Sequence, residues 1–161
     1  MLTQKIVHEL LEYYPETGKL FWRKRNNNEA FTCLSSSGYP RGMILDKGYY
    51  AHRIIWFWVY GEWPKEEIDH INHIRTDNRL CNLREVSRKE NHKNLSKRKN
   101  NTSGKTGVWF DKTNKKWCAM IHNEKWIFLG RYILYEDAVK ARKNAEIKHN
   151  FHENHGKTNE R

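Results

Sequence analysis

Residues 68–92 constrain this chain more than any other stretch, because acidic, imidazole, amide and guanidinium side chains alternate there with short apolar anchors. The run Glu67-Ile68-Asp69-His70, at the start of this stretch, is short enough for a strand, and a polar turn follows at residues 76–79. Ser87 followed by Glu90 has the spacing of a capping box, which predicts a helix from Ser87 onward. The predicted order is therefore a strand, a loop or second strand, and a helix, with Asp69 and His70 on one side and Asn91 on the other.

The motifs of this stretch, taken in order, resemble the active-site motif of HNH endonucleases, the ββα-metal nucleases. Asp-His-Ile-Asn at 69–72, Arg-Thr-Asp-Asn-Arg-Leu at 75–80, Asn-Leu-Arg at 82–84 and Glu-Asn at 90–91 match the phage and intron-borne homing branch. The resemblance implies that His70 is the general base and that Asp69 and Asn91 are metal ligands. It also implies that the Asn82 amide holds the loop and helps to orient the base.

The closing position of the motif is Asn91, although His92 stands beside it. Neighbours on a helix point about 100° apart, so only one of the two can face Asp69. We expect that residue to be Asn91.

The chemistry of these residue types suits the same roles. Phosphodiester hydrolysis needs an activated water and a positive charge at the phosphate. A histidine with an ordinary pKa of about 6.5 is largely neutral at pH 7 and can accept the proton of water. One carboxylate and one amide carbonyl are hard oxygen ligands, which predicts one Mg²⁺ or Mn²⁺ ion per active site. Taken alone, Asp69 and His70 would also fit a hydrogen-bonded pair beside a turn.

The charge of the chain predicts an anionic polymer as its partner. Lys and Arg number 30 against 19 Asp and Glu, a net charge of +11. No apolar run approaches the roughly 20 residues of a membrane span, and the N-terminal residues lack the apolar region of a signal peptide. We expect an intracellular protein of a phage or bacterial host that binds duplex DNA, with no membrane partner and no small-molecule cofactor. Three cysteines without a C-x-x-C pair are expected to be reduced packing residues.

The N-terminal third predicts small elements before the motif. Helical spacing of apolar residues predicts a helix over residues 3–13, followed by a strand at 19–23 and a basic loop at 23–28. Two strands, 38–45 and 48–53, are expected to form a hairpin, and the apolar run 54–60 a buried helix that ends at Gly61. The Ala-His-Arg-Ile-Ile-Trp run at 51–56 also resembles the segment before the active site in phage HNH proteins. His52 is either a group that supports this site or a histidine packed at a strand end.

After the motif, residues 93–106 turn to Ser, Lys, Arg, Asn and Gly, a composition typical of a linker. Three strands are predicted at 107–111, 116–122 and 125–130, and a helix at 136–148 whose small residues line one stripe: Ala138, Ala141 and Ala145. In the second of these strands, side chains are expected to alternate between the two faces of the sheet. One face would carry Trp117, Ala119 and Ile121, and the other Cys118, Met120 and His122.

This sheet with its helix resembles, over residues 104–150, the APETALA2-like DNA-binding domain of plant ethylene-response factors and phage endonucleases. That family inserts the exposed sheet face into the major groove, and the positions that match here are Thr106, Trp109, Met120, His122, Trp126 and Phe128. The plant proteins carry Arg at several of them, whereas Trp, Met and Phe offer apolar contact or stacking. Trp109 and Trp126 could instead pack at the sheet edge. Basic residues in both halves of the chain are expected to contact phosphates, and such contacts hold the register of a protein on DNA without reading its sequence. These residues are Arg75, Arg79, Arg84, Lys97, Arg98, Lys105 and Lys116.

The sequence thus predicts an α+β protein with a ββα-metal nuclease domain followed by a small three-stranded antiparallel sheet and one helix. The predicted boundaries are a nuclease domain at 1–96, a basic linker at 97–106, the APETALA2-like domain at 107–150 and a fraying polar tail at 151–161. The predicted function is metal-dependent cleavage of duplex DNA. Two alternatives stay open: a DNA-binding regulator with an inactive nuclease site, and an RNA-directed nuclease.

Overall fold

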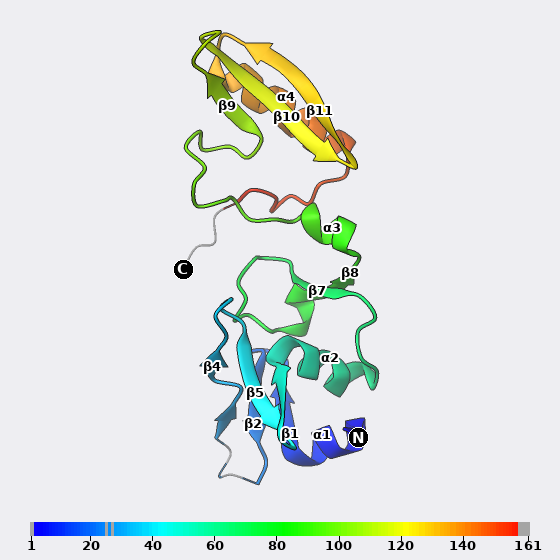
Figure 1. Ribbon diagram of the computed structural model, residues 1–161. Coiled ribbons are helices and arrows are strands. Elements are labelled where there is room, and N and C mark those ends of the chain that lie inside the picture. Colours follow the sequence, from blue (N-terminus) through cyan, green and yellow to red (C-terminus); the bar gives the residue numbers. More distant parts are fainter. Residues whose placement is uncertain (1, 25, 27, 158–161) are drawn as a thin grey trace. The chain divides into compact units, whose positions relative to one another are not determined.

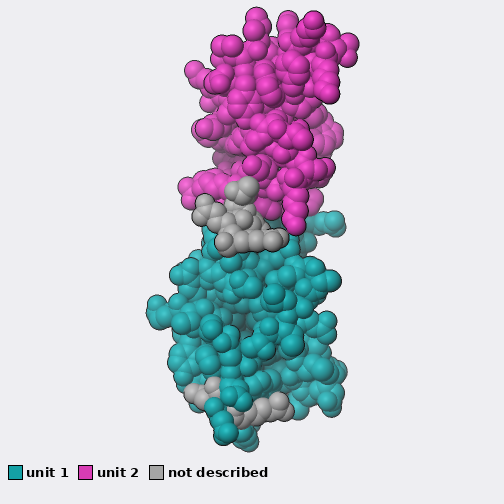
Figure 2. Space-filling model, turned by 90° about the vertical axis from the view of Figure 1, so that its left-hand side faces the viewer, with its two compact units in different colours: residues 1–91, 161 teal, residues 92–160 magenta. Residues whose placement is uncertain are grey.

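The computed structural model describes residues 2–24, 26 and 28–157 (Figure 1). The chain divides into two compact units, residues 1–91 and residues 92–160, which Figure 2 shows in different colours. Both units mix helices and strands, so the predicted α+β class is confirmed. None of the helices in the described ranges is both long enough and apolar enough to cross a membrane.

The first unit begins with a helix that is shorter than the predicted one. Helix α1 spans Gln4–Leu10, and the Thr3 hydroxyl caps it by accepting a hydrogen bond from the Ile6 N–H. The chain then becomes strand β1, Leu11–Tyr14, which pairs antiparallel with β2, Lys19–Trp22. Leu11 fits the helical spacing and also alternates with Tyr13, and the pairing with β2 decides in favour of the strand. The short strand β3, Glu29–Ala30, completes this sheet.

The predicted strand after the first turn is confirmed by β2. The basic loop that follows it falls partly outside the described residues, since Arg25 and Asn27 are not among them.

A second small sheet contains the predicted hairpin. Its strands are β4, Cys33–Leu34, β5, Pro40–Ile44, and β6, Lys47–Tyr50. Leu45 and Asp46 join β5 to β6 with φ of 49° and 61°, as a two-residue hairpin turn requires. The second strand ends three residues earlier than predicted, because helix α2, Ala51–Tyr60, begins directly after Tyr50. Gly61 ends this helix with φ of 76°, as predicted.

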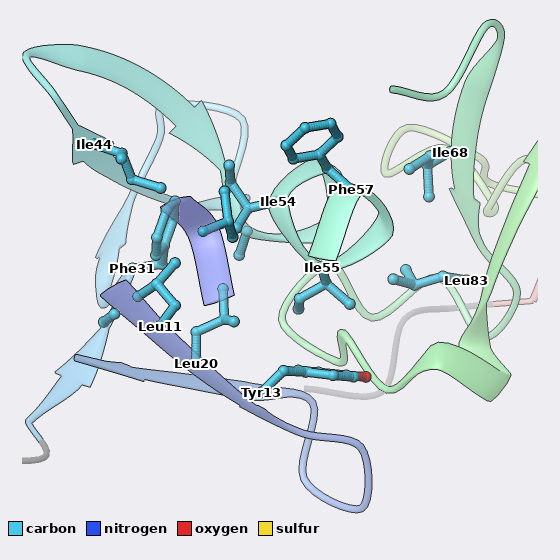
Figure 3. Packing of buried hydrophobic residues seen from close by; sticks show 13 residues of the cluster. Leu11, Tyr13, Leu20, Phe31, Ile44, Ile54, Ile55, Phe57, Ile68 and Leu83 are labelled. Atoms are coloured by element: carbon cyan, nitrogen blue, oxygen red, sulfur yellow. The ribbon is translucent and has the colours of Figure 1, made fainter. Parts of the chain in front are cut away.

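Helix α2 forms the centre of the apolar core of this unit. Ile54 and Ile55 are fully buried, and Figure 3 shows them among Leu11, Leu20 and other side chains from β1 and β2. Burying one such aliphatic side chain contributes about 1.5–3 kcal/mol. The same cluster includes Ile68 and Leu83, so the core anchors both strands of the motif.

The motif itself forms a ββα unit. Strands β7, Glu67–His70, and β8, Leu83–Val86, pair antiparallel, and the 3-10 helix η1, Leu80–Asn82, leads into β8. Helix α3, Arg88–His92, follows. The predicted capping box is present, because the Ser87 N–H donates to Glu90 Oε2 at 3.1 Å and the Glu90 N–H donates to Ser87 Oγ at 3.3 Å.

The second unit is a three-stranded antiparallel sheet packed against one helix, as predicted. The strands are β9, Val108–Asp111, β10, Lys116–Asn123, and β11, Lys125–Tyr132, with β10 in the centre, and the helix is α4, Tyr135–Lys148. Val108, Ala119 and Ala138 are the buried residues at the centre of its apolar cluster.

The buried stripe of α4 differs from the predicted one at a single position. Ala138 and Ala145 are buried, but Ala141 is half-buried and Arg142 is buried instead. The Arg142 guanidinium donates to Met120 O at 2.8 Å and to Glu146 Oε1 at 3.0 Å. A long side chain can bury its stem when its charged end is satisfied in this way. The pattern of small residues therefore did not predict that the packed face of α4 includes the ion pair between Arg142 and Glu146.

The predicted linker begins inside the second unit, and the described part of the predicted tail does not fray. Backbone hydrogen bonds join the two segments: the His152 N–H donates to Lys93 O, the Gly156 N–H to Leu95 O, and the Lys97 N–H to Lys157 O. These bonds give the polar segment 93–97 a fixed partner that its composition does not reveal. Residues 158–161 lie outside the described part of the chain.

The three cysteines are free, as predicted, but only Cys118 is a packing residue. Cys33 and Cys81 are exposed.

Candidate active site

His70 lies at the end of β7 and is only 4% exposed. Its Nε2 lies 2.9 Å from Asn78 Oδ1. An amide oxygen can only accept a hydrogen bond, so Nε2 carries the proton and Nδ1 of the neutral ring keeps its lone pair. Burial lowers the pKa of His70 below its ordinary value, and the Asn78 hydrogen bond and the Asp69 carboxylate oppose that shift. His70 is therefore neutral at pH 7 and has one defined basic nitrogen.

Asn78 was missed by the sequence argument, which gave the orienting role to Asn82. The Asn78 side chain is 3% exposed, and its backbone oxygen accepts a hydrogen bond from the Tyr13 hydroxyl at 3.0 Å. Gly18 has φ of 72° and lies so close that a side chain there would collide with the backbone at Asn78. The contact depends on the path of the loop, so no periodic signal in the sequence marks it.

Asn82 clamps the loop between the two strands. Its Oδ1 accepts a hydrogen bond from the Asn72 N–H at 3.0 Å, and its Nδ2 donates to Asp77 O at 2.8 Å. Its backbone oxygen also accepts from the Ile71 N–H at 2.9 Å. These contacts support the loop-holding half of the predicted role, while Asn78 makes the direct contact with the base.

Asp69 is held by an arginine that was expected to bind DNA. Arg84 stands opposite Asp69 in the β7–β8 pair, and its Nε and Nη2 donate to Asp69 Oδ2 at 3.0 and 2.8 Å. Asp69 is 8% exposed, so the guanidinium balances a carboxylate that is largely removed from water. The structure thus gives Arg84 a role in positioning Asp69.

Asn91 lies beside the strand that carries Asp69. Its Nδ2 donates to Glu67 Oε2 at 2.7 Å, which turns the amide oxygen away from Glu67. Glu67 and Asp69 are two residues apart on β7, so their side chains leave the same strand face. Asn91 lines the pocket described next and His92 is exposed, an arrangement that favours the predicted register.

The side-chain oxygens of Asp69 and Asn91 are of the kind that a hard divalent cation prefers. Within the described ranges, no group of three or more His, Cys, Asp or Glu side chains is arranged to hold a metal ion. Two protein ligands are nevertheless enough for Mg²⁺, which keeps several waters and binds substrate phosphate as well. The donor set therefore suits Mg²⁺ better than a softer metal.

A pocket of about 280 Å³ opens beside these groups. Its lining comes from the loop before β5, the end of β6, the start of α2, β7 and α3: Ser37, Tyr39, Tyr50, His52, Arg53, Glu67, Ile68 and Asn91. The His52 ring lies edge-on to His70, with centroids 5.3 Å apart. Burial lowers the pKa of His52 to about 3, and nearby charge on His70 and Arg53 acts in the same direction. His52 is thus a buried neutral group in the first turn of a helix.

Two further arginines in the motif have partners within the unit. The Arg75 guanidinium lies 5.0 Å from the Tyr39 ring centroid and donates to Ser37 O. Arg79 forms an ion pair with Asp77 at 2.7 Å, and this contact lowers the pKa of the Asp77 carboxyl. Both arginines are exposed, so their contact with DNA stays a prediction.

The predicted DNA-binding face of the second unit carries exposed rings. Trp126 is 67% exposed, Phe128 52% and Trp109 39%. Trp126 stands opposite His122 and Phe128 opposite Met120, so these four residues share one face of β10 and β11. The exposure of Trp126 argues against packing at the sheet edge.

The basic residues around this unit differ in how free they are. Lys116 and Arg98 are exposed, and Lys97 is half-buried. Lys105 forms an ion pair with Glu146 at 2.8 Å and is mostly buried, so its ammonium group is committed within the unit. The prediction of a phosphate contact is therefore best kept for Lys116, Arg98 and Lys97.

Residues 49–93 match the family profile of HNH endonucleases. This segment contains α2, β7, β8 and nearly the whole of the site, and the chain therefore carries an HNH endonuclease domain. A search of curated proteins finds no match. One solved structure, described as "DNA binding and cleavage by the HNH homing endonuclease I-HmuI", is 23% identical with a TM-score of 0.41. The match covers 50% of this chain and 48% of that one, so the chain spans about half the length of that protein.

Proposed function

We propose that this protein is a metal-dependent DNA endonuclease that hydrolyses phosphodiester bonds with His70 as the general base. One observation carries the proposal: the proton of His70 is fixed on Nε2 by Asn78, within an HNH domain that places Asp69 in the same strand. A base that is already neutral and held in one tautomer is what water activation requires.

In the proposed reaction, His70 Nδ1 takes a proton from a water molecule as the water oxygen attacks phosphorus. The bond from phosphorus to the leaving deoxyribose oxygen breaks, that oxygen takes a proton from solvent water, and one DNA strand is cut. A positioned base of this kind contributes about 10² to 10⁴ in rate. Asp69 and Asn91 would hold a Mg²⁺ or Mn²⁺ ion, which supplies positive charge at the phosphate when bound. Arg84 keeps the Asp69 carboxylate in place.

Duplex DNA is the proposed substrate. The net charge of +11 favours a polyanion, and the exposed Trp126, Phe128, Met120 and His122 offer a sheet face for groove contact. Lys116 and Arg98 would contact phosphates and hold the register.

Supercoiled plasmid incubated with the purified chain, with and without Mg²⁺, tests the proposal. Nicked or linear product that depends on Mg²⁺ and is lost in His70→Ala supports it. Gel-shift binding without any product would favour a regulator with an inactive site. Cleavage confined to an RNA substrate of the same sequence would favour an RNA-directed nuclease.

A further inference from the structure

The N-terminal end of helix α2 opens onto the pocket beside His70. Tyr50 precedes the helix, and among the described residues its side chain makes no capping hydrogen bond to it. The first N–H groups of a helix have no partner within the helix, and they carry partial positive charge. His52 and Arg53, both in this first turn, line the pocket. The pocket therefore meets backbone donors and a guanidinium group at one end.

His52 supplies a second, independent sign of a ligand. The side chain is 8% exposed, and its Nδ1 is buried without a hydrogen-bond partner among the described residues. Its ring is stacked on Tyr50 at 5.6 Å and lies edge-on to His70. Buried polar atoms are nearly always hydrogen-bonded. An imidazole held rigidly with a nitrogen unpaired in a pocket is therefore typical of a site that awaits a polar ligand.

The charges around the pocket indicate what that ligand is. Arg53 contributes a full positive charge and makes a single long hydrogen bond, 3.4 Å, to Pro64 O among the described residues. Glu67 adds a carboxylate to the lining, but its Oε2 accepts a hydrogen bond from Asn91. A guanidinium, a helix N-terminus and a neutral imidazole together suit an anion with several acceptor oxygens.

We propose that His52, Arg53 and the first N–H groups of α2 bind the non-bridging oxygens of the DNA phosphate that is attacked by the water molecule from which His70 takes a proton. The inference rests on the proposed nuclease function and adds the residues that hold the phosphate. His52 would then be a catalytic residue in its own right, since it touches the reacting group. His70 does not itself line the pocket, but its ring centroid lies 5.3 Å from that of His52, so a phosphate held there would lie near the base.

Binding of thymidine 3′,5′-bisphosphate to the full chain, measured by calorimetry without divalent metal, tests this directly. His52→Phe keeps the ring and its stacking but removes both nitrogens, and Arg53→Gln removes the charge. Each should weaken binding about tenfold or more, the usual effect of losing one hydrogen bond to a charged group. His52→Asn places an amide near the position of Nδ1 and should bind more tightly than His52→Phe. Lys47→Gln removes one charge from the start of β6, outside the pocket, and should bind as the wild type does.

The result that overturns the inference is equally definite. Wild-type affinity in both His52→Phe and Arg53→Gln, or no binding by the wild type at millimolar probe, excludes a phosphate site here. If thermal unfolding shows that His52→Phe is not folded, two other measurements test the phosphate site. They are the affinity of Arg53→Gln for the bisphosphate and the change in the imidazole nitrogen chemical shifts of His52 when the bisphosphate is added to the wild type. Bisphosphate binding without plasmid cleavage would reject the nuclease and keep the anion site, whereas cleavage with binding unchanged in the variants would do the reverse.

Discussion

Asn78 accepts a hydrogen bond from Nε2 of His70 at 2.9 Å, and both side chains are buried. Eight positions separate them, and the loop between β7 and β8 brings them together. The contact sets which ring nitrogen carries the proton, and so which one can act as a base. The tautomer of the proposed catalytic histidine thus depends on an amide other than Asn82 and Asn91, the two that the resemblance singled out.

Asn78→Ala should lower the cleavage rate about 10- to 100-fold, the usual effect of removing a group that orients a functional histidine. Binding of DNA should be unchanged. Asn78→Asp should move the acidic limb of the pH–rate profile to higher pH, because a carboxylate stabilises the protonated ring and raises the pKa of His70. Single-turnover rates from pH 5 to 8 measure both effects, with the exposed Asn28→Ala as control. Unchanged profiles in both variants would remove Asn78 from the mechanism.

His70→Ala should abolish plasmid cleavage and leave DNA affinity intact, since His70 is proposed to take a proton from water and the phosphate is held by other groups. The expected loss is about 10² to 10⁴ in rate. Time courses of plasmid nicking, together with gel shifts, separate the two effects. A variant that still cuts at the wild-type rate would show that another group activates the water.

The metal preference should follow the oxygen ligands. Mg²⁺ and Mn²⁺ should support cleavage and Zn²⁺ should substitute poorly, whereas Asn91→His should shift the preference toward Zn²⁺ and Ni²⁺. His92→Ala should have little effect, because His92 does not line the pocket. Activity across a metal series measures this for each variant. If His92→Ala is inactive and Asn91→Ala cuts normally, the ligand is His92.

The buried His52 should make the stability of the first unit depend on pH. The pKa of His52 is about 3 in the folded chain and about 6.5 when unfolded. Between these values the unfolded state binds more protons, so stability falls as pH drops below 6.5, by about 1.4 kcal/mol per unit. Urea titrations at pH 7 and pH 5 should show the wild type losing about 2 kcal/mol more than His52→Phe. An equal loss in both proteins would mean that His52 is not held neutral.

The exposed face of β10 and β11 should carry much of the DNA affinity. Trp126→Ala and Phe128→Ala should each weaken duplex binding, because apolar or stacking contacts at the groove are lost. Lys116→Gln should reduce the salt dependence of log K by about one phosphate contact. Fluorescence anisotropy at several salt concentrations measures affinity and slope. Ile147→Ala, which changes an exposed apolar residue on α4, is the matched control, and an equal effect there would argue against the sheet face.

Much of the fold could be predicted because local chemistry and spacing agree. The capping box at Ser87 and Glu90, the hairpin of β5 and β6, and the strands of the second unit depend on residues close in sequence. The hairpin turn was predicted at residues 46–48 and lies one residue earlier, at Leu45 and Asp46. The end of α1 could not be placed in the same way, because Leu11 satisfies both the helical and the alternating period. Pairing with β2 decided it, and that pairing is tertiary.

For the candidate site too, the sequence could indicate which residues belong to it, but not the contacts that depend on the tertiary fold. A resemblance in sequence identified Asp69, His70, Asn82 and Asn91 as a group, but it could not show their partners. Arg84 was expected on DNA and lies on Asp69, and Lys105 was expected on phosphate and lies on Glu146. Neither ion pair was predicted, because net charge predicts a polyanionic partner for a surface, while the partner of each cation within the chain is set by the side chains that the fold brings within reach.

The hydrogen bonds of Asn82 determine at which step, folding or substrate binding, the β7–β8 loop loses its conformational entropy. Fixing each backbone residue costs about 1–2 kcal/mol of conformational entropy. Because Asn82 already holds the N–H of Asn72 and the carbonyl of Asp77, that cost falls on folding and not on the encounter with substrate. His70 and Asn78 are therefore already aligned in the folded chain, and in the proposed reaction that alignment would cost no further entropy at the transition state. The stability of the first unit and the rate of the proposed cleavage would then both depend on one amide side chain.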